Sequence, residues 1–287
     1  MIKLNNVKVS YKNKLAVDIT DEIVFGDCQK IGIIGSNGAG KSTLIKAILG
    51  IVNYDGNIYN DIAPEKIAVH MQFNNYSESV PTRDIIQMIA NRKIESDKNL
   101  MDLIKYFDFE KLLKKTFKQL SGGEKQKLTL ILVMWQNSPV TVFDEVTTGL
   151  DFVTRQSLMK KIVDYYKDKP TTILMVSHYY QELEDICDKL LYLNDGKVLF
   201  FGDKKEMFLK YCSKSVILCD KNSITESLID EKTRLVAMEN KIAAGFCDVE
   251  SEKKLIEKLV DNNQSFERLN DSIELTVLNA LNKEATK

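Results

Sequence analysis

"KIGIIGSNGAGKSTLIKAILG", residues 30–50, is the stretch of sequence that decides the fold. Its opening run of apolar residues is typical of a strand that is covered on both faces of a sheet. The following segment, 35–43, has the spacing Gly-x-x-x-x-Gly-Lys-Ser, at which backbone N–H groups wrap a phosphate. Apolar residues then recur on one helical face up to Gly50, a residue that favours a helix end. Strand, loop and helix in this order predict a phosphate-binding loop in an α/β protein.

The side chains of this loop suit a nucleotide bound with Mg²⁺. Lys41 is placed to neutralise phosphate oxygens, and the hydroxyl of Ser42 is a suitable Mg²⁺ ligand. The loop residues that we expect to contact the nucleotide are Ser36, Asn37, Gly38, Ala39, Gly40, Lys41, Ser42 and Thr43.

Polar residues close three later apolar runs, each of which predicts a strand. Asp144 and Glu145 follow "TVF", Gln72 follows "IAVHM", and His178 follows "ILMVS". The carboxyl ends of strands in an α/β sheet are where ligands bind. Asp144 is suited to hold Mg²⁺, Glu145 to orient or deprotonate an attacking water, and His178 to contact the γ-phosphate. We therefore interpret Glu145, His178 and Gln72 as catalytic, and Ser42, Gln72 and Asp144 as metal-binding.

A second candidate anion site lies in "LSGGEKQKL", residues 120–128. The helix start at Ser121-Gly122-Gly123 leaves backbone N–H groups free to face an anion. The site belongs to a mostly helical insertion over about 73–135, in which Thr82 is expected to cap a helix over 82–93. One chain of this length does not need two loops for the same phosphates.

These motifs together resemble those of the nucleotide-binding subunits of ABC transporters. In the family's order they are the A-loop Tyr11, Walker A 35–43, Q-loop Gln72, signature 120–124, Walker B 140–145, D-loop 149–151 and H-loop His178. The resemblance implies an ATPase that works as a head-to-tail homodimer with two ATP sites. It also implies that Tyr11 stacks on adenine. ATP is then contacted in trans by Ser121, Gly122, Gly123 and Asp151.

The departures from the family pattern are small. Ser36 stands where proline is frequent, Glu124 replaces the signature glutamine, and Lys127 stands where arginine is common. No proline follows Glu145 or Asp151. None of these changes removes a group expected to touch phosphate or Mg²⁺, so we expect hydrolysis to be intact.

Two domains are expected. Residues 1–211 resemble the P-loop ABC ATPase core, an α/β fold with a mixed sheet, flanking helices, an N-terminal antiparallel β portion and the helical insertion. For residues 212–287 the sequence predicts a small α+β accessory or dimerisation module. Its expected elements are a strand at 216–219, an extended pair within 235–249, and helices at 252–261 and 272–282.

The tail "RLNDSIELTVLNALNKE" resembles the ending of ABC-2-type exporter ATPases. We therefore expect the energy subunit of an exporter that drives a transmembrane permease, with a drug, a lipid or an amphipathic antimicrobial peptide as cargo. The expected permease contact is a groove around 73–107 that carries Phe73, Tyr76, Met88 and Met101. An importer ATPase stays open as an alternative, as does a soluble ATPase acting on DNA or ribosomes. The single ATPase domain disfavours the last.

Composition restricts the partners and the compartment. A net charge of −1 and a pI near 6.2 give no overall basic field for nucleic acid. Five cysteines without CxxC spacing and only two histidines predict neither a stable disulfide nor a zinc site. The opening residues alternate as a strand does, unlike a signal peptide. We therefore expect a cytoplasmic chain, held at the inner face of the membrane by its permease.

Overall fold

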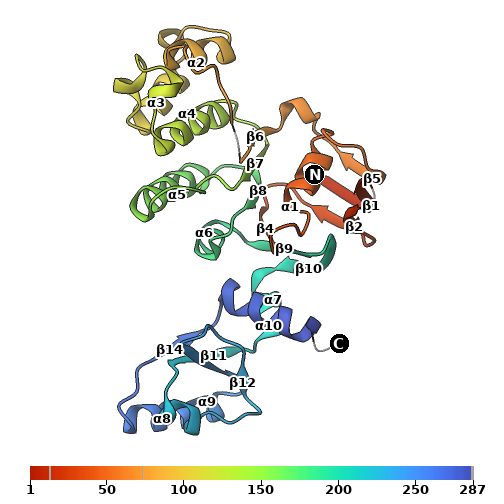
Figure 1. Cartoon of the computed structure of the whole chain (residues 1–287), viewed down its shortest axis with the longest axis vertical. Coiled ribbons are helices and arrows are strands. Elements are labelled where there is room, and N and C mark those ends of the chain that lie inside the picture. The colour runs from red at the N-terminus through yellow and green to blue at the C-terminus, as the bar shows by residue number, and fades with distance from the viewer. Residues whose placement is uncertain (13, 73, 286–287) are drawn as a thin grey trace. The chain divides into compact units, whose positions relative to one another are not determined.

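The computed structural model describes residues 1–12, 14–72 and 74–285. It divides the chain into two compact units, 1–201 and 202–287 (Figure 1). The second unit thus begins before residue 212, because α7 (Lys204–Tyr211) packs against the last helix, α10 (Ile273–Ala285). Phe73 of the expected permease groove lies outside the described residues.

A six-stranded sheet forms the centre of the first unit. Its order is β10 (Lys197–Asp203), β9 (Lys189–Asn194), β4 (Lys30–Ile34), β8 (Thr172–Val176), β7 (Val140–Asp144) and β6 (Ala68–His70). The five strands from β9 to β6 are parallel, and β4, β7 and β8 are almost wholly buried. β10 returns from β9 through Asp195 and Gly196, whose φ angles of 45° and 80° suit a two-residue hairpin.

An antiparallel sheet lies at the start of the chain. Its strands are β1 (Ile2–Tyr11), β2 (Lys14–Ile19), β3 (Ile23–Phe25) and β5 (Asp55–Asn60). Apolar side chains of β1, such as Leu4 and Val9, pack in one core with Leu44 of α1 (Lys41–Ile48) and Ile33 of β4. The expected α/β fold with a mixed sheet, flanking helices and an N-terminal antiparallel portion is confirmed.

The helical insertion contains α2 (Thr82–Ala90), α3 (Lys98–Tyr106) and α4 (Gly122–Trp135). Short 3₁₀ turns flank these helices: η2 (Ile94–Ser96), η3 (Glu110–Leu112) and η4 (Phe117–Gln119). A further 3₁₀ turn, η1 (Pro64–Lys66), precedes β6. The prediction that Thr82 caps α2 is wrong. Pro81 occupies the cap, and the Thr82 hydroxyl instead donates to the Leu112 carbonyl at 2.8 Å.

Two helices connect the carboxyl ends of central strands to the next strand. α5 (Phe152–Tyr166) follows β7, and α6 (Tyr180–Ile186) follows β8. The loops before them carry Glu145, Asp151 and His178. Within the described ranges no helix is long and apolar enough to cross a membrane.

The second unit contains a β-α-β-β-α-β arrangement of the ferredoxin-like type. Its elements are β11 (Ser215–Asp220), α8 (Ser223–Leu228), β12 (Arg234–Leu235), β13 (Lys241–Phe246), α9 (Val249–Asp261) and β14 (Phe266–Leu269). The antiparallel order is β12-β13-β11-β14. Leu255 and Leu259 of α9 pack on one face of the sheet, and Phe208 and Leu275 pack on the other. The sequence did not predict α7, α8 or β14.

Candidate functional site

The phosphate loop between β4 and α1 is fixed by glycines that no other residue can replace. Gly35 and Gly40 have φ angles of 150° and 100°, values that side chains strongly disfavour. A Cβ at Gly35 would lie 2.2 Å from the Leu193 carbonyl oxygen, and one at Gly40 would lie 2.4 Å from that of Ala16. The loop is therefore packed tightly between β9 and β2.

Lys41 is buried at the start of α1 and faces the inside of the loop. Its ammonium group donates to the carbonyl oxygens of Gly35 at 2.8 Å and Ser36 at 3.0 Å. Burial lowers the pKa of Lys41, and the nearby carboxylates of Glu145 and Asp144 oppose that shift. Ser36, Asn37 and Gly38 are exposed along the loop, whereas Ala39 and Gly40 are buried and Ser42 and Thr43 are half-buried.

Ser42 and Asp144 lie next to each other, as their predicted roles require. The Ser42 hydroxyl donates to Oδ1 of Asp144 at 3.3 Å, and Asp144 is only 1% exposed. Burial raises the pKa of Asp144, although the Ser42 hydrogen bond opposes this. A buried carboxylate beside a hydroxyl offers the oxygen ligands that Mg²⁺ prefers. No group of three His, Cys, Asp or Glu side chains suited to a metal occurs in the described part of the chain.

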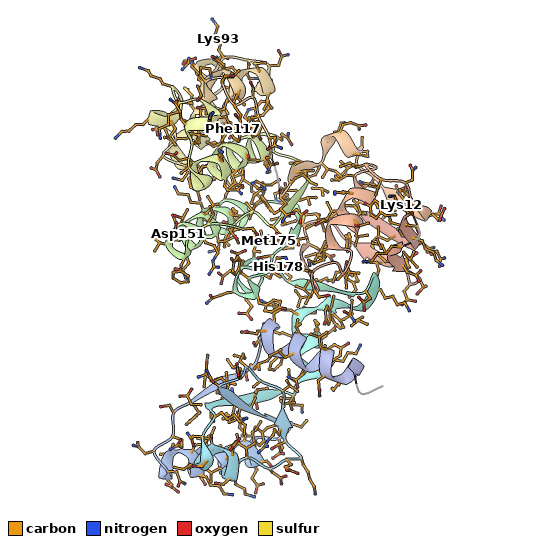
Figure 2. All side chains as sticks on the ribbon, viewed as in Figure 1. Lys12, Lys93, Phe117, Asp151, Met175 and His178 are labelled. Atoms are coloured by element: carbon orange, nitrogen blue, oxygen red, sulfur yellow. The ribbon has the colours of Figure 1, made fainter. Side chains whose placement is uncertain are left out.

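The structure brings Gln72, Glu145 and His178 together around one carboxylate. Gln72 Nε2 donates to Oε2 of Glu145 at 2.8 Å, and the Thr148 hydroxyl donates to the same oxygen at 3.2 Å. His178 Nε2 lies 2.9 Å from the other carboxylate oxygen, Oε1. His178 stands just beyond the end of β8 (Figure 2). Three strand ends that are distant in sequence thus converge on Glu145.

The backbone at Glu145 is strained. Its φ angle of 53° lies in the left-handed region, which typically costs about 1–3 kcal/mol for a residue other than glycine. The turn is held by the Glu145 N–H, which donates to the carbonyl of Val176 in the adjacent strand at 3.0 Å. Such strain concentrates at functional sites, where the surrounding structure fixes it.

Tyr11 stands at the tip of the β1–β2 hairpin and is 46% exposed. It pairs with Lys14, two residues before Ala16, whose carbonyl abuts Gly40. The exposed ring therefore belongs to the hairpin that borders the phosphate loop.

Ser121 is engaged in a reciprocal cap at the start of α4. The Glu124 N–H donates to the Ser121 hydroxyl at 3.3 Å, and the Ser121 N–H donates to Glu124 Oε2 at 2.7 Å. Lys115 donates to the other oxygen of Glu124 at 3.0 Å. Burial acts to raise the pKa of Glu124, but the bonds from Ser121 and Lys115 outweigh it and lower the pKa. Glu124 is thus held as a paired anion.

Gly122 and Gly123 form a second group with the loop that precedes α5. A Cβ at Gly123 would meet the methyl group of Thr154 at 3.0 Å, and one at Gly122 would lie 3.7 Å from Leu150. Asp151 caps α5 by accepting a hydrogen bond from the Thr154 N–H at 3.0 Å. The four residues expected to act in trans, namely Ser121, Gly122, Gly123 and Asp151, therefore lie on two adjoining helix starts.

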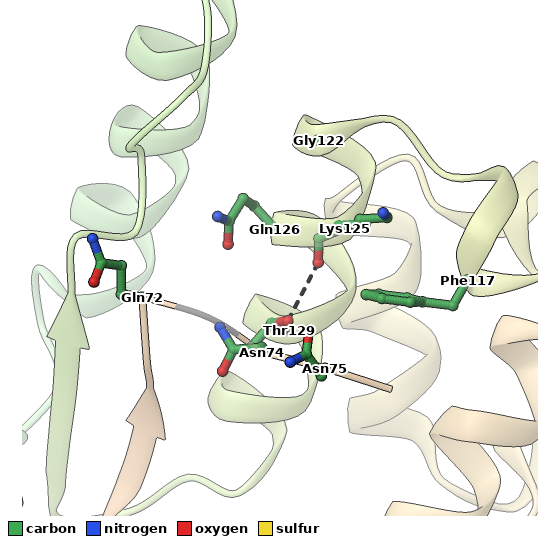
Figure 3. A pocket seen from close by; sticks show the side chains of 8 residues that line it. All are labelled: Gln72, Asn74, Asn75, Phe117, Gly122, Lys125, Gln126 and Thr129. Carbon is green, nitrogen blue, oxygen red and sulfur yellow. Dashed lines mark hydrogen bonds between the residues drawn. The ribbon is translucent and has the colours of Figure 1, made fainter. Parts of the chain in front are cut away.

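A pocket of about 200 Å³ lies between the segment after β6 and the first turns of α4 (Figure 3). Gln72 and Gly122 both line it, so it joins two positions that the sequence singled out separately. Its other lining residues are Asn74, Asn75, Phe117, Lys125, Gln126 and Thr129.

Sequence reasoning missed two residues that contact these groups. Thr148 bonds Glu145 three residues away, and a hydroxyl at the start of a turn is a weak local signal for this. Lys115 reaches Glu124 from a different turn of the chain, and no sequence signal identifies this pairing.

Known proteins resemble this chain in sequence. A family model described as "ABC transporter" matches residues 24–148. The manganese transport system ATP-binding protein MntB of Bacillus subtilis is 32% identical over 72% of this chain and 88% of its own length. The tungstate uptake system ATP-binding protein TupC of Peptoclostridium acidaminophilum is 29% identical over 69% of this chain and 96% of its own. The Nod factor export ATP-binding protein I of Rhizobium sp. is 29% identical over 75% of each chain.

The fold also has solved counterparts. A structure described as the ATP-binding subunit of an ABC transporter superimposes with a TM-score of 0.66 at 22% identity. It covers 74% of this chain and 93% of its own. Between 25% and 31% of the chain lies outside each of these matches, which cover 69–75% of it.

Proposed function

The chain belongs to the ABC transporter family as an ATP-binding, ATP-hydrolysing energy subunit, and on this premise we propose how its residues work and what they drive. The observation that carries the proposal is the group of Gln72, Glu145 and His178, each just beyond the carboxyl end of a parallel strand of the six-stranded sheet. We propose that ATP is hydrolysed beside this group.

The phosphate loop binds ATP in this proposal. N–H groups of residues 36–43 wrap the phosphates, and Lys41 turns from the carbonyl oxygens of Gly35 and Ser36 to the β- and γ-phosphates. Tyr11 stacks on the adenine from the neighbouring hairpin.

Ser42, Gln72 and Asp144 would hold Mg²⁺, which neutralises charge on the phosphate oxygens when bound. Glu145 orients the attacking water through one carboxylate oxygen and accepts its proton. His178, beside the other oxygen of Glu145, donates a hydrogen bond to the γ-phosphate. Gln72 holds the carboxylate of Glu145 in place and reaches towards the water.

The working unit is a head-to-tail homodimer. Ser121, Gly122, Gly123 and Asp151 lie on two adjoining helix starts, a group separate from the hydrogen-bonded cluster around Glu145. In the dimer this group covers the ATP held by the partner's phosphate loop. ATP then binds the closed state only and shifts the population towards it.

The helical insertion transmits the closure to a transmembrane permease. Met88 of α2 is 74% exposed, and the neighbouring Ile89 is 44% exposed. These neighbouring apolar side chains offer a contact surface within the expected range 73–107. Tyr76 is half-buried, with its hydroxyl bonded to Thr129 at 3.3 Å, and so supports the groove from inside.

The direction of transport is the most specific part of the proposal. The tail motif and the similarity to a Nod factor export protein favour export of a drug, lipid or peptide. The similarity to a tungstate uptake protein favours import to the same degree. Because the ATPase core is shared by both classes, the permease and not this chain decides between them.

The unit after residue 201 is proposed to stabilise the dimer or regulate it. It has its own hydrophobic cores on both faces of a four-stranded sheet. The matches to known ATP-binding proteins cover 72% and 74% of the chain and leave the remainder unmatched.

The test is recovery of partners from detergent-solubilised membranes of the host, with the tagged full-length chain. We expect one protein with several membrane-spanning helices. Met88→Asp should reduce its recovery, whereas Ile51→Asp, a matched change at an exposed apolar residue outside the insertion, should not. Recovery of ribosomal or DNA-binding proteins alone would contradict the transporter proposal. Reconstituting the recovered pair in vesicles then shows whether cargo enters or leaves.

A further inference from the structure

A buried carboxylate outside the predicted site lies at the centre of a small polar network. Glu182, on α6, is only 5% exposed. Its Oε1 accepts a hydrogen bond from the Thr147 hydroxyl at 2.6 Å, and its Oε2 accepts one from the Ser177 hydroxyl at 2.6 Å. Arg155 on α5 lies 3.8 Å from Oε1. The buried charge is therefore balanced by one cation and two hydroxyl donors, as a stable buried carboxylate requires.

The partners of Glu182 lie on the segments that carry the proposed catalytic groups. Thr147 comes two residues after Glu145, and Ser177 directly precedes His178. Arg155 follows Asp151 by one helical turn at the start of α5.

A second layer of contacts fastens the segment around His178. The Arg155 guanidinium stacks on the Tyr179 ring, 3.8 Å from its centroid. The Tyr179 N–H donates to the Ser177 hydroxyl oxygen at 3.0 Å. His178 is thus flanked on both sides by residues that are tied to Glu182 directly or through Arg155.

We propose that Glu182 is a positioning residue that holds the three segments bearing Glu145, His178 and Asp151 in one fixed arrangement. The inference rests on the proposed roles of Glu145 and His178. β7 and β8 align Asp144 with Val176, but the sheet ends there, and both catalytic side chains project from the loops beyond. Glu182 joins these two loops where the strands no longer do.

The consequence for catalysis follows from distance. Glu145 Oε1 and His178 Nε2 lie 2.9 Å apart. When groups in an active site are displaced by about 1 Å, the reaction rate typically falls about 100-fold. The phosphate loop, by contrast, is fixed by its own contacts with Leu193 and Ala16. Loss of the Glu182 network should therefore lower kcat and leave ATP affinity unchanged.

The decisive variants are Thr147→Val and Thr147→Ser in the full-length chain. Valine keeps the volume of threonine but removes the hydroxyl, whereas serine keeps the hydroxyl. We expect Thr147→Val to lower kcat about 10- to 100-fold with unchanged ATP affinity, and Thr147→Ser to stay near wild type. Glu182→Ala, which removes both acceptor oxygens, should lower kcat at least as much. The double variant with Thr147→Val should lose less than the product of the two single losses, because both act in one network.

Amide hydrogen exchange of the nucleotide-free chain gives a readout independent of hydrolysis. Glu182→Ala removes the acceptor of the Ser177 hydroxyl. The Tyr179 N–H then loses its fixed acceptor, so peptides containing Tyr179 should exchange faster in Glu182→Ala. Ser138→Ala is the matched control. It also removes a buried, hydrogen-bonded hydroxyl, but Ser138 precedes the start of β7, at the opposite end of the strand from Glu145. It should leave kcat and the exchange of Tyr179 unchanged.

Two results would overturn the proposal. One is a kcat for Thr147→Val that equals that of wild type, or that is lowered no more than the kcat of Thr147→Ser. The other is unchanged exchange at Tyr179 in a folded Glu182→Ala chain. If Glu182→Ala does not fold, the two Thr147 variants still decide. Failure of the proposed base would show separately, as normal turnover in Glu145→Gln.

Discussion

Replacing Glu145 by glutamine separates the shape of the site from its chemistry. The carboxylate accepts two hydrogen bonds on Oε2, from Gln72 at 2.8 Å and Thr148 at 3.2 Å, and faces His178 on Oε1 at 2.9 Å. An amide oxygen can keep the first two bonds. The amide N–H₂ can donate to His178 Nε2 when the neutral ring carries its proton on Nδ1. The Gln side chain therefore fits without an unpaired polar group.

The expected magnitude follows from what is lost. The variant can still orient a water but cannot accept its proton, and a positioned general base typically contributes about 10²- to 10⁴-fold. This corresponds to about 2.7–5.4 kcal/mol of transition-state stabilisation. Binding of ATP should be unchanged, because the phosphate loop is built from other residues.

The assay is phosphate release by the purified chain, with ATP affinity measured by equilibrium binding and folding checked by thermal unfolding. Glu145→Ala is the matched comparison, since it leaves Gln72 and His178 without their partner and should also disturb the geometry. A kcat for Glu145→Gln within a few-fold of wild type would refute the base assignment. Equal losses of kcat and ATP affinity would refute the argument that the shape of the site is preserved.

Three further changes test other parts of the site. Burial raises the pKa of Asp144. The contribution of the Asp144 side chain to the free energy of unfolding is therefore fully present at low pH, where the carboxyl is protonated, and is lost as the pH rises through the raised pKa. Without nucleotide, Asp144→Asn should therefore have a higher Tm than wild type at neutral pH, and this difference in Tm should shrink towards pH 4. The variant should also lose the rise in Tm that Mg²⁺ and ATP give wild type. Gly35→Ala would place a Cβ 2.2 Å from the Leu193 carbonyl and should abolish ATP binding in equilibrium titrations; retained affinity would contradict the packing argument. Lys115→Met should leave Glu124 without its cationic partner at the helix start that is proposed to face the partner's ATP, and should weaken the proposed ATP-driven dimerisation in sedimentation or light scattering. Glu124→Gln should restore dimerisation of the Lys115→Met chain; no rescue would show that charge is not the cause.

The positions of the strand ends were predictable from the sequence because their signals are local. Continuous apolar runs mark β4, β7 and β8. Asp144 and Glu145 close the run of β7, Ser177 and His178 follow β8, and Gly35 opens the phosphate loop after β4. The turn at Asp195-Gly196 was likewise predictable, since both residues tolerate positive φ angles. The catalytic roles assigned to these strand ends stay predictions until the variants above are measured.

Short elements and caps were beyond the reach of the sequence. β14 spans four residues and α8 six, too few for a periodic pattern to stand out. Thr82 has the side chain of a helix cap, yet it bonds the carbonyl of Leu112 instead. Competition from a residue 30 positions away overrides the local preference.

The sequence by itself determined the phosphate loop, because a tight turn around phosphate requires glycines at fixed spacing and a lysine and a hydroxyl directly after them. Only the tertiary structure decided which side chains surround that loop. Gln72, Glu145 and His178 meet because parallel strands end at the same edge of the sheet. Glu182 joins the loops of Glu145 and His178 through hydrogen bonds to residues 35 and 5 positions away. Hydrogen bonds depend on distance in space, and spacing along the chain does not record it.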